Sequence, residues 1–381
     1  METETVKGFK DFIGEDAEKR EYIRSILMDI FERYGFEPAE TPVVEYEEFV
    51  KGENSNDEAV SDVFKLKDKG ERNLALRYEF TFQLKRLMKN RKLPYKRCEI
   101  GYVFRDEPVS SNRFRQITQC DVDIIGSTTK DEAEVLTIVR DVLYTLGIKF
   151  VIYVNNRKLL NEILEKENIE KTDWEKVIRE IDKMDKLPEN EVCNNLRGYN
   201  AQNLLDIFKK PESFFEKYES YSEIKELKKY CEYYGTDIQF LPNLARGLSY
   251  YNGSVFEVKT KEMKETITAG GSYIFNGVQS TGLSFGLERL STLARVNPKK
   301  DKVLVLSISE DEESIKVVEK LRKSGKNCII FFGKPTKALE YANSRGVKEV
   351  YFVGKEEIKN RKIKIKDLES GEERLVLMDK I

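Results

Sequence analysis

The spacing of apolar residues predicts two long helices in the first half of the chain. Between positions 15 and 34, apolar side chains recur every three or four residues, and Gly35 follows as a stop signal (Ile23, Ile26, Leu27, Ile30, Phe31). Residues 129–146 repeat this spacing with a more mixed face. The segment 36–44 contains two prolines and is predicted to be extended.

Alternation of polar and apolar residues predicts strands between and after these helices. Residues 63–77 alternate and turn at Lys69-Gly70, which indicates a β-hairpin. Residues 149–154 are almost continuously apolar, as is typical of a buried strand. Two further runs, 100–104 and 121–125, are joined by a polar loop and predict a second antiparallel hairpin.

The second hairpin carries many charged and polar residues for strands that should be half buried. Arg105 and Glu107 follow its first strand, and Gln119 and Asp123 lie along its second strand. Buried charges are costly unless they are paired or bound to a ligand. Two interpretations stay open from this hairpin alone: a structural network of arginine–carboxylate pairs, or a binding site.

The middle of the chain, residues 156–235, changes to a highly charged helical pattern. It contains the single Trp174 and is interrupted by Pro188 and Pro211. We interpret it as a helical insertion in a domain formed by residues 1–155 and 236–297. The alternative is a solvated helical appendage.

Beyond a polar linker at 297–301, strands and helices alternate. This pattern predicts a small α/β domain with parallel strands over residues 301–381. No glycine-rich turn follows its first strand, which excludes a dinucleotide-binding unit. The sequence KNRKIKIK at 359–366 fits either a basic strip for a nucleic-acid backbone or an edge strand protected by lysines.

Composition narrows the class of protein. A length of 381 residues with 40% hydrophobic content supports two or three domains with real cores. The net charge of −2 excludes a global basic field for nucleic acid, although local patches are compatible with it.

The five cysteines form no CxxC pair, which argues against a zinc site or a disulfide framework. With no apolar run of transmembrane length and no signal-peptide pattern, we expect a soluble cytoplasmic protein without a membrane partner.

The chain contains no histidine. This excludes histidine-based catalytic triads and the usual general base at neutral pH. Any chemistry must therefore use Arg, Asp, Glu, Lys, Tyr and backbone groups.

The hairpin sequence resembles motif 2 of class II aminoacyl-tRNA synthetases, in the histidyl-tRNA synthetase version. The matching pattern is Phe104-Arg105-x-Glu107, a short loop, Arg113-Phe-Arg115 and then QCDVDIIG at 119–126. The resemblance implies that Arg105 acts catalytically on the α-phosphate of ATP, since a guanidinium fork matches phosphate oxygens. It also implies that Glu107 accepts from the adenine amine and that Arg113 binds ATP.

The segment 246–257 is the most specific match to histidyl-tRNA synthetases. It contains Arg-Gly-Leu-x-Tyr-Tyr-x-Gly-x-Val-Phe-Glu, which implies a catalytic Arg246 at the α-phosphate and two tyrosines, Tyr250 and Tyr251, around an imidazole. One departure is Ser249, where the family often has aspartate.

Two further segments resemble the last glycine-rich strand and motif 3. Residues 268–273 imply a histidine-binding Tyr273, and residues 282–290 imply an ATP-binding Arg289. The family usually has Arg-Tyr-Asp where this chain has Ser272-Tyr273-Ile274, a double departure at the floor of the site.

The remaining histidine-binding candidates also come from the resemblance. The Leu-Arg-Tyr-Glu-x-Thr sequence implies that Glu79 and Thr81 receive the α-ammonium group, and the motif 2 strand implies Gln119 and Asp123 as further contacts. By resemblance, Asp123 accepts the imidazole N–H. The alternative is that Asp123 pairs with Arg113 or Arg115 and only holds the hairpin.

The resemblance implies an α+β fold: an antiparallel sheet flanked by helices, a helical insertion and a C-terminal anticodon-binding α/β domain. The helix at 15–34 and the segment through Pro42 resemble motif 1, which implies a homodimer; an amphipathic helix packing on its own sheet is the alternative. The implied activity joins histidine to tRNA(His) with ATP as substrate and Mg²⁺ assisting. Two rivals remain. One is a catalytically silent regulatory subunit of ATP phosphoribosyltransferase. The other is a class II synthetase for proline or threonine, against which the segment 246–257 argues.

Overall fold

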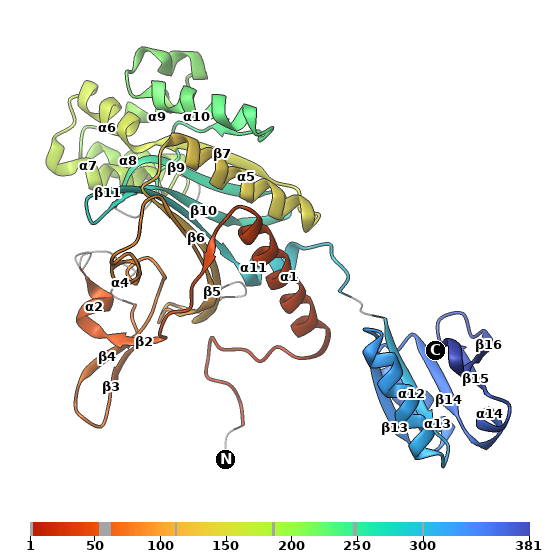
Figure 1. Cartoon of the computed structure of the whole chain (residues 1–381). Coiled ribbons are helices and arrows are strands. Elements are labelled where there is room, and N and C mark those ends of the chain that lie inside the picture. Colours follow the sequence, from red (N-terminus) through yellow and green to blue (C-terminus); the bar gives the residue numbers. More distant parts are fainter. Residues whose placement is uncertain (1–2, 53–61, 111–112, 185–186, 247–249, 299–300) are drawn as a thin grey trace. The chain divides into compact units, whose positions relative to one another are not determined.

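The computed structural model describes residues 3–52, 62–110, 113–184, 187–246, 250–298 and 301–381. The chain divides into two compact units, Met1–Val296 and Asn297–Ile381, which are drawn in Figure 1. None of the helices in the described residues is both long and apolar enough to cross a lipid bilayer.

An eight-stranded sheet forms the centre of the first unit, counted over the described residues. Its inner strands are antiparallel, whereas the short strands β1 and β8 at the two edges pair in parallel, so the predicted antiparallel sheet is mixed at its edges. The strands follow in the spatial order β1 (Glu37–Pro38), β5 (Tyr95–Phe104), β6 (Gln116–Ile125), β11 (Val278–Gly286), β10 (Met263–Phe275), β9 (Tyr251–Thr260), β7 (Val151–Asn156) and β8 (Gln239–Phe240).

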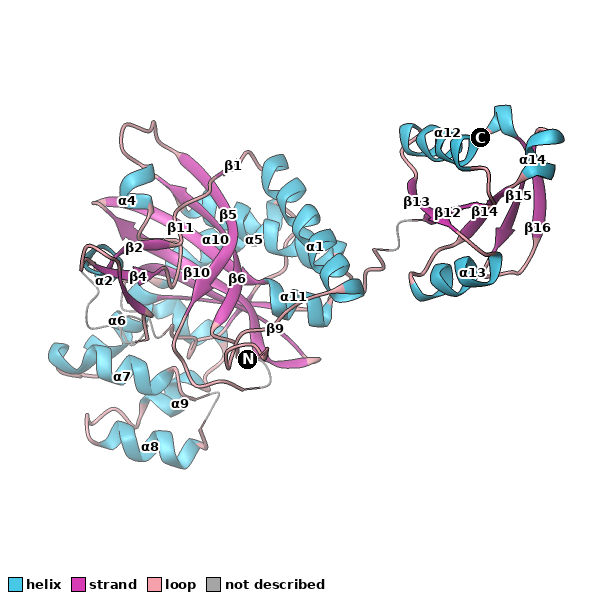
Figure 2. Ribbon diagram, turned by 90° about the horizontal axis from the view of Figure 1, so that it is seen from below, coloured by secondary structure: helices cyan, strands magenta, loops and turns pink. Residues whose placement is uncertain are grey.

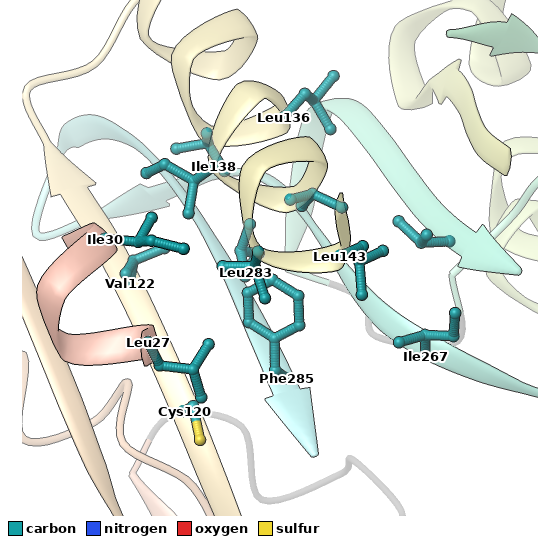
Figure 3. Packing of buried hydrophobic residues seen from close by; sticks show 14 of the residues in the cluster. Leu27, Ile30, Cys120, Val122, Leu136, Ile138, Leu143, Ile267, Leu283 and Phe285 are labelled. Carbon is teal, nitrogen blue, oxygen red and sulfur yellow. The ribbon is translucent and has the colours of Figure 1, made fainter. Parts of the chain in front are cut away.

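Helices cover one face of this sheet and form the main core with it. These are α1 (Gly14–Arg33), α5 (Thr129–Thr145), α10 (Tyr221–Tyr233) and α11 (Leu287–Leu293). Figure 3 shows Leu27 and Ile30 of α1 beside Cys120 and Val122 of β6. Successive strand residues point to opposite faces, so the polar residues between these core positions face the other side.

The periodic apolar stripe of α1 is buried against the chain's own sheet. Ile23, Leu27, Ile30 and Phe31 are at most 1% exposed and belong to the main core. The stripe itself therefore requires no second chain, and the alternative of a helix packing on its own sheet accounts for it.

The predicted hairpins are both present. The charged one consists of β5 and β6, which extend beyond the predicted strands and pair from Tyr95↔Ile125 to Phe104↔Gln116. The other consists of β3 (Lys65–Lys67) and β4 (Asn73–Leu76), where Asp68 accepts hydrogen bonds from the backbone of Gly70 and Arg72 in the turn. Strand β2 (Val44–Tyr46) completes this small sheet, which packs with α2 (Glu47–Lys51); the four-residue helix α4 (Leu84–Leu87) follows β4 in the chain.

The helical region after β7 has a hydrophobic core of its own, to which Leu160, Ile178 and Leu196 belong. Helix α10 joins two cores, because its Ile224 packs in this cluster and its Leu227 in the main core. The elements of the region before α10 are α6 (Arg157–Lys166), η1 (Lys171–Asp173), α7 (Trp174–Ile181), α8 (Glu189–Arg197), α9 (Leu204–Phe208) and η2 (Glu212–Lys217).

The second unit is a five-stranded sheet with a helix on each face (Figure 2). Its order is β13 (Asn327–Phe332), β12 (Lys302–Ser307), β14 (Glu349–Val353), β15 (Lys362–Asp367) and β16 (Glu373–Leu377). Strands β13, β12 and β14 pair in parallel, in agreement with the predicted parallel strands, whereas β15 and β16 are added antiparallel. Helices α12 (Asp311–Lys323) and α13 (Pro335–Ser344) cover opposite faces; α14 (Lys355–Lys359) and η3 (Met378–Lys380) complete the unit.

The lysine-rich strand β15 is not an edge strand. It lies between β14 and β16, and its Lys364 and Lys366 approach Glu373 of β16 at 3.6 and 3.5 Å. The interpretation of an exposed edge protected by lysines is therefore wrong.

Candidate active site

A cavity of about 1220 Å³ lies over the face of the central sheet that the helices of the main core leave open. Every candidate from the sequence lines it, although these residues are scattered over more than 200 positions of the chain: Glu79, Thr81, Arg105, Glu107, Arg113, Gln119, Asp123, Arg246, Tyr250, Tyr251, Tyr273 and Arg289.

Strand register brings the residues of the sheet together. Asp123 pairs with Arg97 on one side and with Gly282 on the other, and Gly282 pairs in turn with Gly271. A Cβ atom on Gly282 would lie 2.3 Å from Oδ1 of Asp123, and one on Gly271 would lie 2.9 Å from the ring of Tyr251. Glycine is therefore needed at both positions, because side chains of neighbouring strands lie directly over its backbone.

Asp123 is held from two sides. Its Oδ2 lies 3.2 Å from Nη2 of Arg97, and its Oδ1 accepts a hydrogen bond of 2.6 Å from the hydroxyl of Tyr273. The predicted alternative partners, Arg113 and Arg115, are wrong: they approach Glu107 and Asp106 instead. Burial raises the pKa of Asp123 above its usual range, and Arg97 and Tyr273 oppose part of that rise.

Arg97 belongs to a buried charge network beneath the cavity. Its Nη2 donates to the backbone oxygen of Phe80 at 2.7 Å, and its Nη1 lies 3.8 Å from Glu99. Glu99 also accepts from Thr41 and from Arg77, which lies 3.1 Å away. The network thus connects Asp123 with the segment that carries Glu79 and Thr81. It has features of both interpretations of the charged hairpin, because its ion pairs support residues that face a cavity.

Asp121 is a further cavity carboxylate, to which we assigned no role from the sequence. It lies between Gln119 and Asp123 on the same face of β6, as two-residue alternation predicts. Nε2 of Gln119 donates to it at 3.2 Å. Burial and, after it, the charge of Asp123 raise the pKa of Asp121 to about 7.

Three tyrosines form one wall of the cavity. The ring centroids of Tyr250 and Tyr251 are 4.7 Å apart, and those of Tyr250 and Tyr273 are 5.8 Å apart. Burial raises the pKa of all three tyrosines above its usual range. They therefore remain neutral hydroxyls at neutral pH. Together with Asp123, these tyrosines line one part of the cavity.

Arg105, Glu107 and Arg113 lie at the loop of the hairpin. Arg105 donates to the backbone oxygen of Tyr78 and to the side chain of Gln119, both at 3.2 Å. Glu107 lies 4.0 Å from Arg105 and 3.9 Å from Arg113, at the outer limit of an ion pair. These side chains therefore keep hydrogen-bonding capacity toward the cavity.

Two further arginines line the cavity: Arg246 lies between β8 and β9 in the chain, and Arg289 lies on α11. Arg246 lies 3.3 Å from Glu257 of β9, and Nη1 of Arg289 donates to the backbone oxygen of Thr266 at 2.6 Å. Burial lowers the pKa of Arg289, and the nearby cations of Arg113, Arg105 and Arg246 lower it further against the opposing effect of Glu265. Four cations thus share one region, which favours a polyanionic ligand.

The departures from the family pattern lie away from the cavity or outside the described residues. The Ser272 side chain is buried on the helix-covered face and donates to Glu132, and Ile274 is largely exposed. Only Tyr273 between them lines the cavity. Ser249 lies outside the described residues.

Carboxylates near the arginines can contribute to a magnesium site. Among the described residues, no three or more Asp, Glu, Cys or His side chains are grouped as a metal cage. Mg²⁺ usually takes only one or two carboxylates together with substrate phosphates, and Glu257 and Glu265 line the cavity beside Arg246 and Arg289. The donor set therefore fits a phosphate-bound Mg²⁺.

Comparison with known proteins gives consistent results. A family model described as histidyl-tRNA synthetase matches residues 8–290, and one described as an anticodon binding domain matches residues 302–381. The chain is 31% identical to histidine--tRNA ligase 2 of Shouchella clausii, over 98% of each chain. The structure of histidyl-tRNA synthetase from a Nostoc species superimposes with a TM-score of 0.88 at 25% identity, covering 100% of this chain and 98% of that one. A Bacillus halodurans structure described as ATP phosphoribosyltransferase regulatory subunit/histidyl-tRNA synthetase has a TM-score of 0.77 at 20% identity, covering 92% and 98%, and is similar in fold.

Proposed function

The chain belongs to the histidyl-tRNA synthetase family, and from this premise we propose that it is a histidine–tRNA ligase that activates histidine with ATP and transfers it to tRNA(His). The observation that carries this proposal is the division of one cavity into two regions. One holds buried carboxylates beside a tyrosine wall, and the other holds four arginines.

The carboxylate region suits the side chain of histidine. A neutral imidazole has one N–H donor and one acceptor nitrogen, and Asp123 with the tyrosine hydroxyls supplies partners for both. Glu79 and Thr81 reach the cavity from the loop that Arg97 supports through Phe80, and they are suited to bind the α-ammonium group. Gln119, which accepts from Arg105, lies between the two regions.

The arginine region suits ATP. Arg105 and Arg246 would neutralise charge at the α-phosphate, Arg113 and Arg289 would bind the distal phosphates, and Glu107 would accept from the adenine amine. A carboxylate oxygen of histidine forms a bond to the α-phosphorus as the bond to the bridging oxygen of pyrophosphate breaks. This displacement depends on positioning and charge stabilisation more than on proton transfer, so a chain without histidine can catalyse it.

Mg²⁺ would be held mainly by the phosphates, with Glu257 and Glu265, which line the cavity, as the proposed acidic ligands. When bound, it would add positive charge beside the phosphate oxygens.

In the second step, a hydroxyl of the 3′-terminal ribose of tRNA attacks the carbonyl carbon, an ester forms and AMP leaves. We propose that residues 301–381 bind the anticodon, that residues 156–235 are an insertion near the acceptor end, and that residues 1–155 and 236–297 form the catalytic domain. Support comes from the anticodon-binding match at 302–381 and from α7, whose Lys176 and Arg179 line the cavity. The proposed site of action is the cytoplasm, where tRNA is charged.

We also propose a homodimer formed through the Glu15–Pro42 region, as the resemblance to motif 1 implies. Large apolar side chains are exposed in this region and directly beside it, and such residues favour burial against another surface: Ile13, Tyr22, Val43, Val44 and Tyr46. Sedimentation at micromolar concentration tests this proposal, and a monomer would contradict it.

The rival function is a histidine-binding regulatory subunit of ATP phosphoribosyltransferase, favoured only by the departures at Ser249, Ser272 and Ile274. Histidine-dependent exchange of pyrophosphate into ATP separates the two. A ligase incorporates label only when histidine is present. A chain that binds histidine in calorimetry but exchanges no label would support the rival.

A further inference from the structure

A buried carboxylate lies on the helix-covered face of the sheet, behind the tyrosine wall. Glu132, in the first turn of α5, is 6% exposed and accepts a hydrogen bond from Ser272 of β10. The hydroxyl of Ser254 of β9 also favours the charged form of this carboxylate and so lowers its pKa. The cap of α5 is made by Thr128 and Asp131, so Glu132 has no part in it.

The two serines lie within an irregularity in the pairing of β9 and β10. Gly271 pairs with Val255 and Tyr273 pairs with Tyr251, so three residues of β9 (252–254) stand opposite the single Ser272 of β10. Such a bulge interrupts the backbone ladder and redirects the neighbouring side chains. Here it brings Tyr251 and Tyr273 opposite each other on the cavity face.

We propose that Glu132 is a positioning residue for histidine binding: by joining Ser272 to Ser254 across the bulge, it holds Tyr251 and Tyr273 in place from the opposite face of the sheet. This inference rests on the proposed histidine site, since Tyr273 donates to Asp123. Burial raises the pKa of Glu132, and the two serine hydrogen bonds counteract this rise. One of its oxygens, Oε2, is buried without a protein partner among the described residues, so the charge is costly for stability alone.

The test compares Glu132→Met, which removes the acceptor, with Glu132→Gln, which keeps an acceptor oxygen. In histidine-dependent pyrophosphate exchange, Glu132→Met should raise the KM for histidine roughly fivefold to tenfold. This is the change expected when a contribution of the size of one hydrogen bond is lost from the binding site. The KM for ATP should stay unchanged, and Glu132→Gln should recover most of the effect. Glu134→Gln is the matched control, because Glu134 lies on the same helix and pairs with Lys96.

A KM for histidine that is unchanged in a folded Glu132→Met variant overturns the inference, because a merely structural residue would alter only the melting temperature. If Glu132→Met does not fold, the double variant Ser254→Ala/Ser272→Ala removes the same contacts and must show the same rise in KM. If the wild-type chain exchanges no label, the proposed function fails independently. The inference is then judged by the Kd for histidine in calorimetry with the same variants.

Discussion

Arg97 and Asp123 form an ion pair of 3.2 Å across neighbouring strands, and the side chain of Arg97 has no exposed surface. The same guanidinium donates to the backbone oxygen of Phe80, in the loop that carries Glu79 and Thr81. One buried cation thus contacts two parts of the proposed histidine site, so mutations here should affect folding and binding together.

Removing one partner of this pair should be more destabilising than removing both. Asp123→Leu leaves the buried Arg97 without its nearest carboxylate, so we expect a loss of about 3–5 kcal/mol in the free energy of unfolding. The double variant Arg97→Met/Asp123→Leu should recover part of this loss. Urea unfolding monitored by the fluorescence of Trp174, the single tryptophan, reports on the first unit. A double variant as unstable as the sum of both singles would contradict the coupling.

Asp123→Asn should separate binding from packing, because the amide keeps an acceptor oxygen and loses the charge. A charge-assisted hydrogen bond contributes about 1.5–3 kcal/mol, so we expect the KM for histidine to rise about tenfold to a hundredfold. The KM for ATP should stay constant in pyrophosphate exchange. Asp141→Asn, at a carboxylate outside the cavity that pairs with Arg140, is the control. A normal KM for histidine would leave Asp123 with a structural role only.

Gly282→Ala should displace Asp123 without changing any charged residue. The added Cβ atom would lie 2.3 Å from Oδ1 of Asp123 and 2.9 Å from the backbone oxygen of Val122. Overpacking of this kind costs about 1–3 kcal/mol in stability unless Asp123 moves aside. Because Asp123 is then displaced from the histidine site, histidine affinity measured by calorimetry should fall about tenfold. Gly198→Ala is the control, because its Cβ atom would meet only the backbone oxygen of Asn195 at 3.5 Å. Unchanged affinity in a folded Gly282→Ala protein would argue against a role of Asp123 in binding.

The pKa of Asp121 should make stability depend on pH. Its folded value of about 7 lies above the ordinary 3.8, so the folded chain holds this proton more tightly than the unfolded chain does. Stability should therefore decrease as the pH rises from about 4 to about 7 and then level off. Asp121→Asn should remove this decrease and be more stable than wild type at pH 8, by on the order of 1–3 kcal/mol. Melting temperatures at pH 5.5 and pH 8 provide the measurement.

The exposed Asp29 provides the control for this pH experiment, since Asp29→Asn removes a carboxylate that pairs with Arg33 at the surface. Its pH profile should match that of wild type. A parallel profile for Asp121→Asn as well would show that Asp121 does not retain its proton near neutral pH.

Arg289→Gln should weaken ATP binding and leave histidine binding intact. Arg289 lies in the region of four cations that lines the cavity. Loss of one charge-assisted contact should raise the KM for ATP roughly tenfold. Arg295→Gln is the control, since Arg295 is exposed and pairs with Glu262. Equal loss of histidine affinity in calorimetry without ATP would contradict the division of the cavity.

The sequence alone determined the elements and the candidate residues. Helical spacing placed the helix that the structure has at Gly14–Arg33, and alternation placed both hairpins. The order of the motifs identified candidate residues that all line one cavity. Such motifs consist of certain residue types at fixed spacing along the chain, so they can be found in the sequence. These signals act over a few residues, which is the range that periodicity and turn chemistry cover.

Only the tertiary structure decided which groups meet. The partner of Asp123 is Arg97, not Arg113 or Arg115, because strand register places residues 97 and 123 directly opposite. Register likewise turned Ser272 toward Glu132. Strand order enclosed β15 between two strands, and helix-on-sheet packing buried the apolar stripe of α1 in the chain's own core. Pairing between distant segments depends on how sheets and helices assemble, and a shift of one residue in register would move every side chain of a strand to the opposite face.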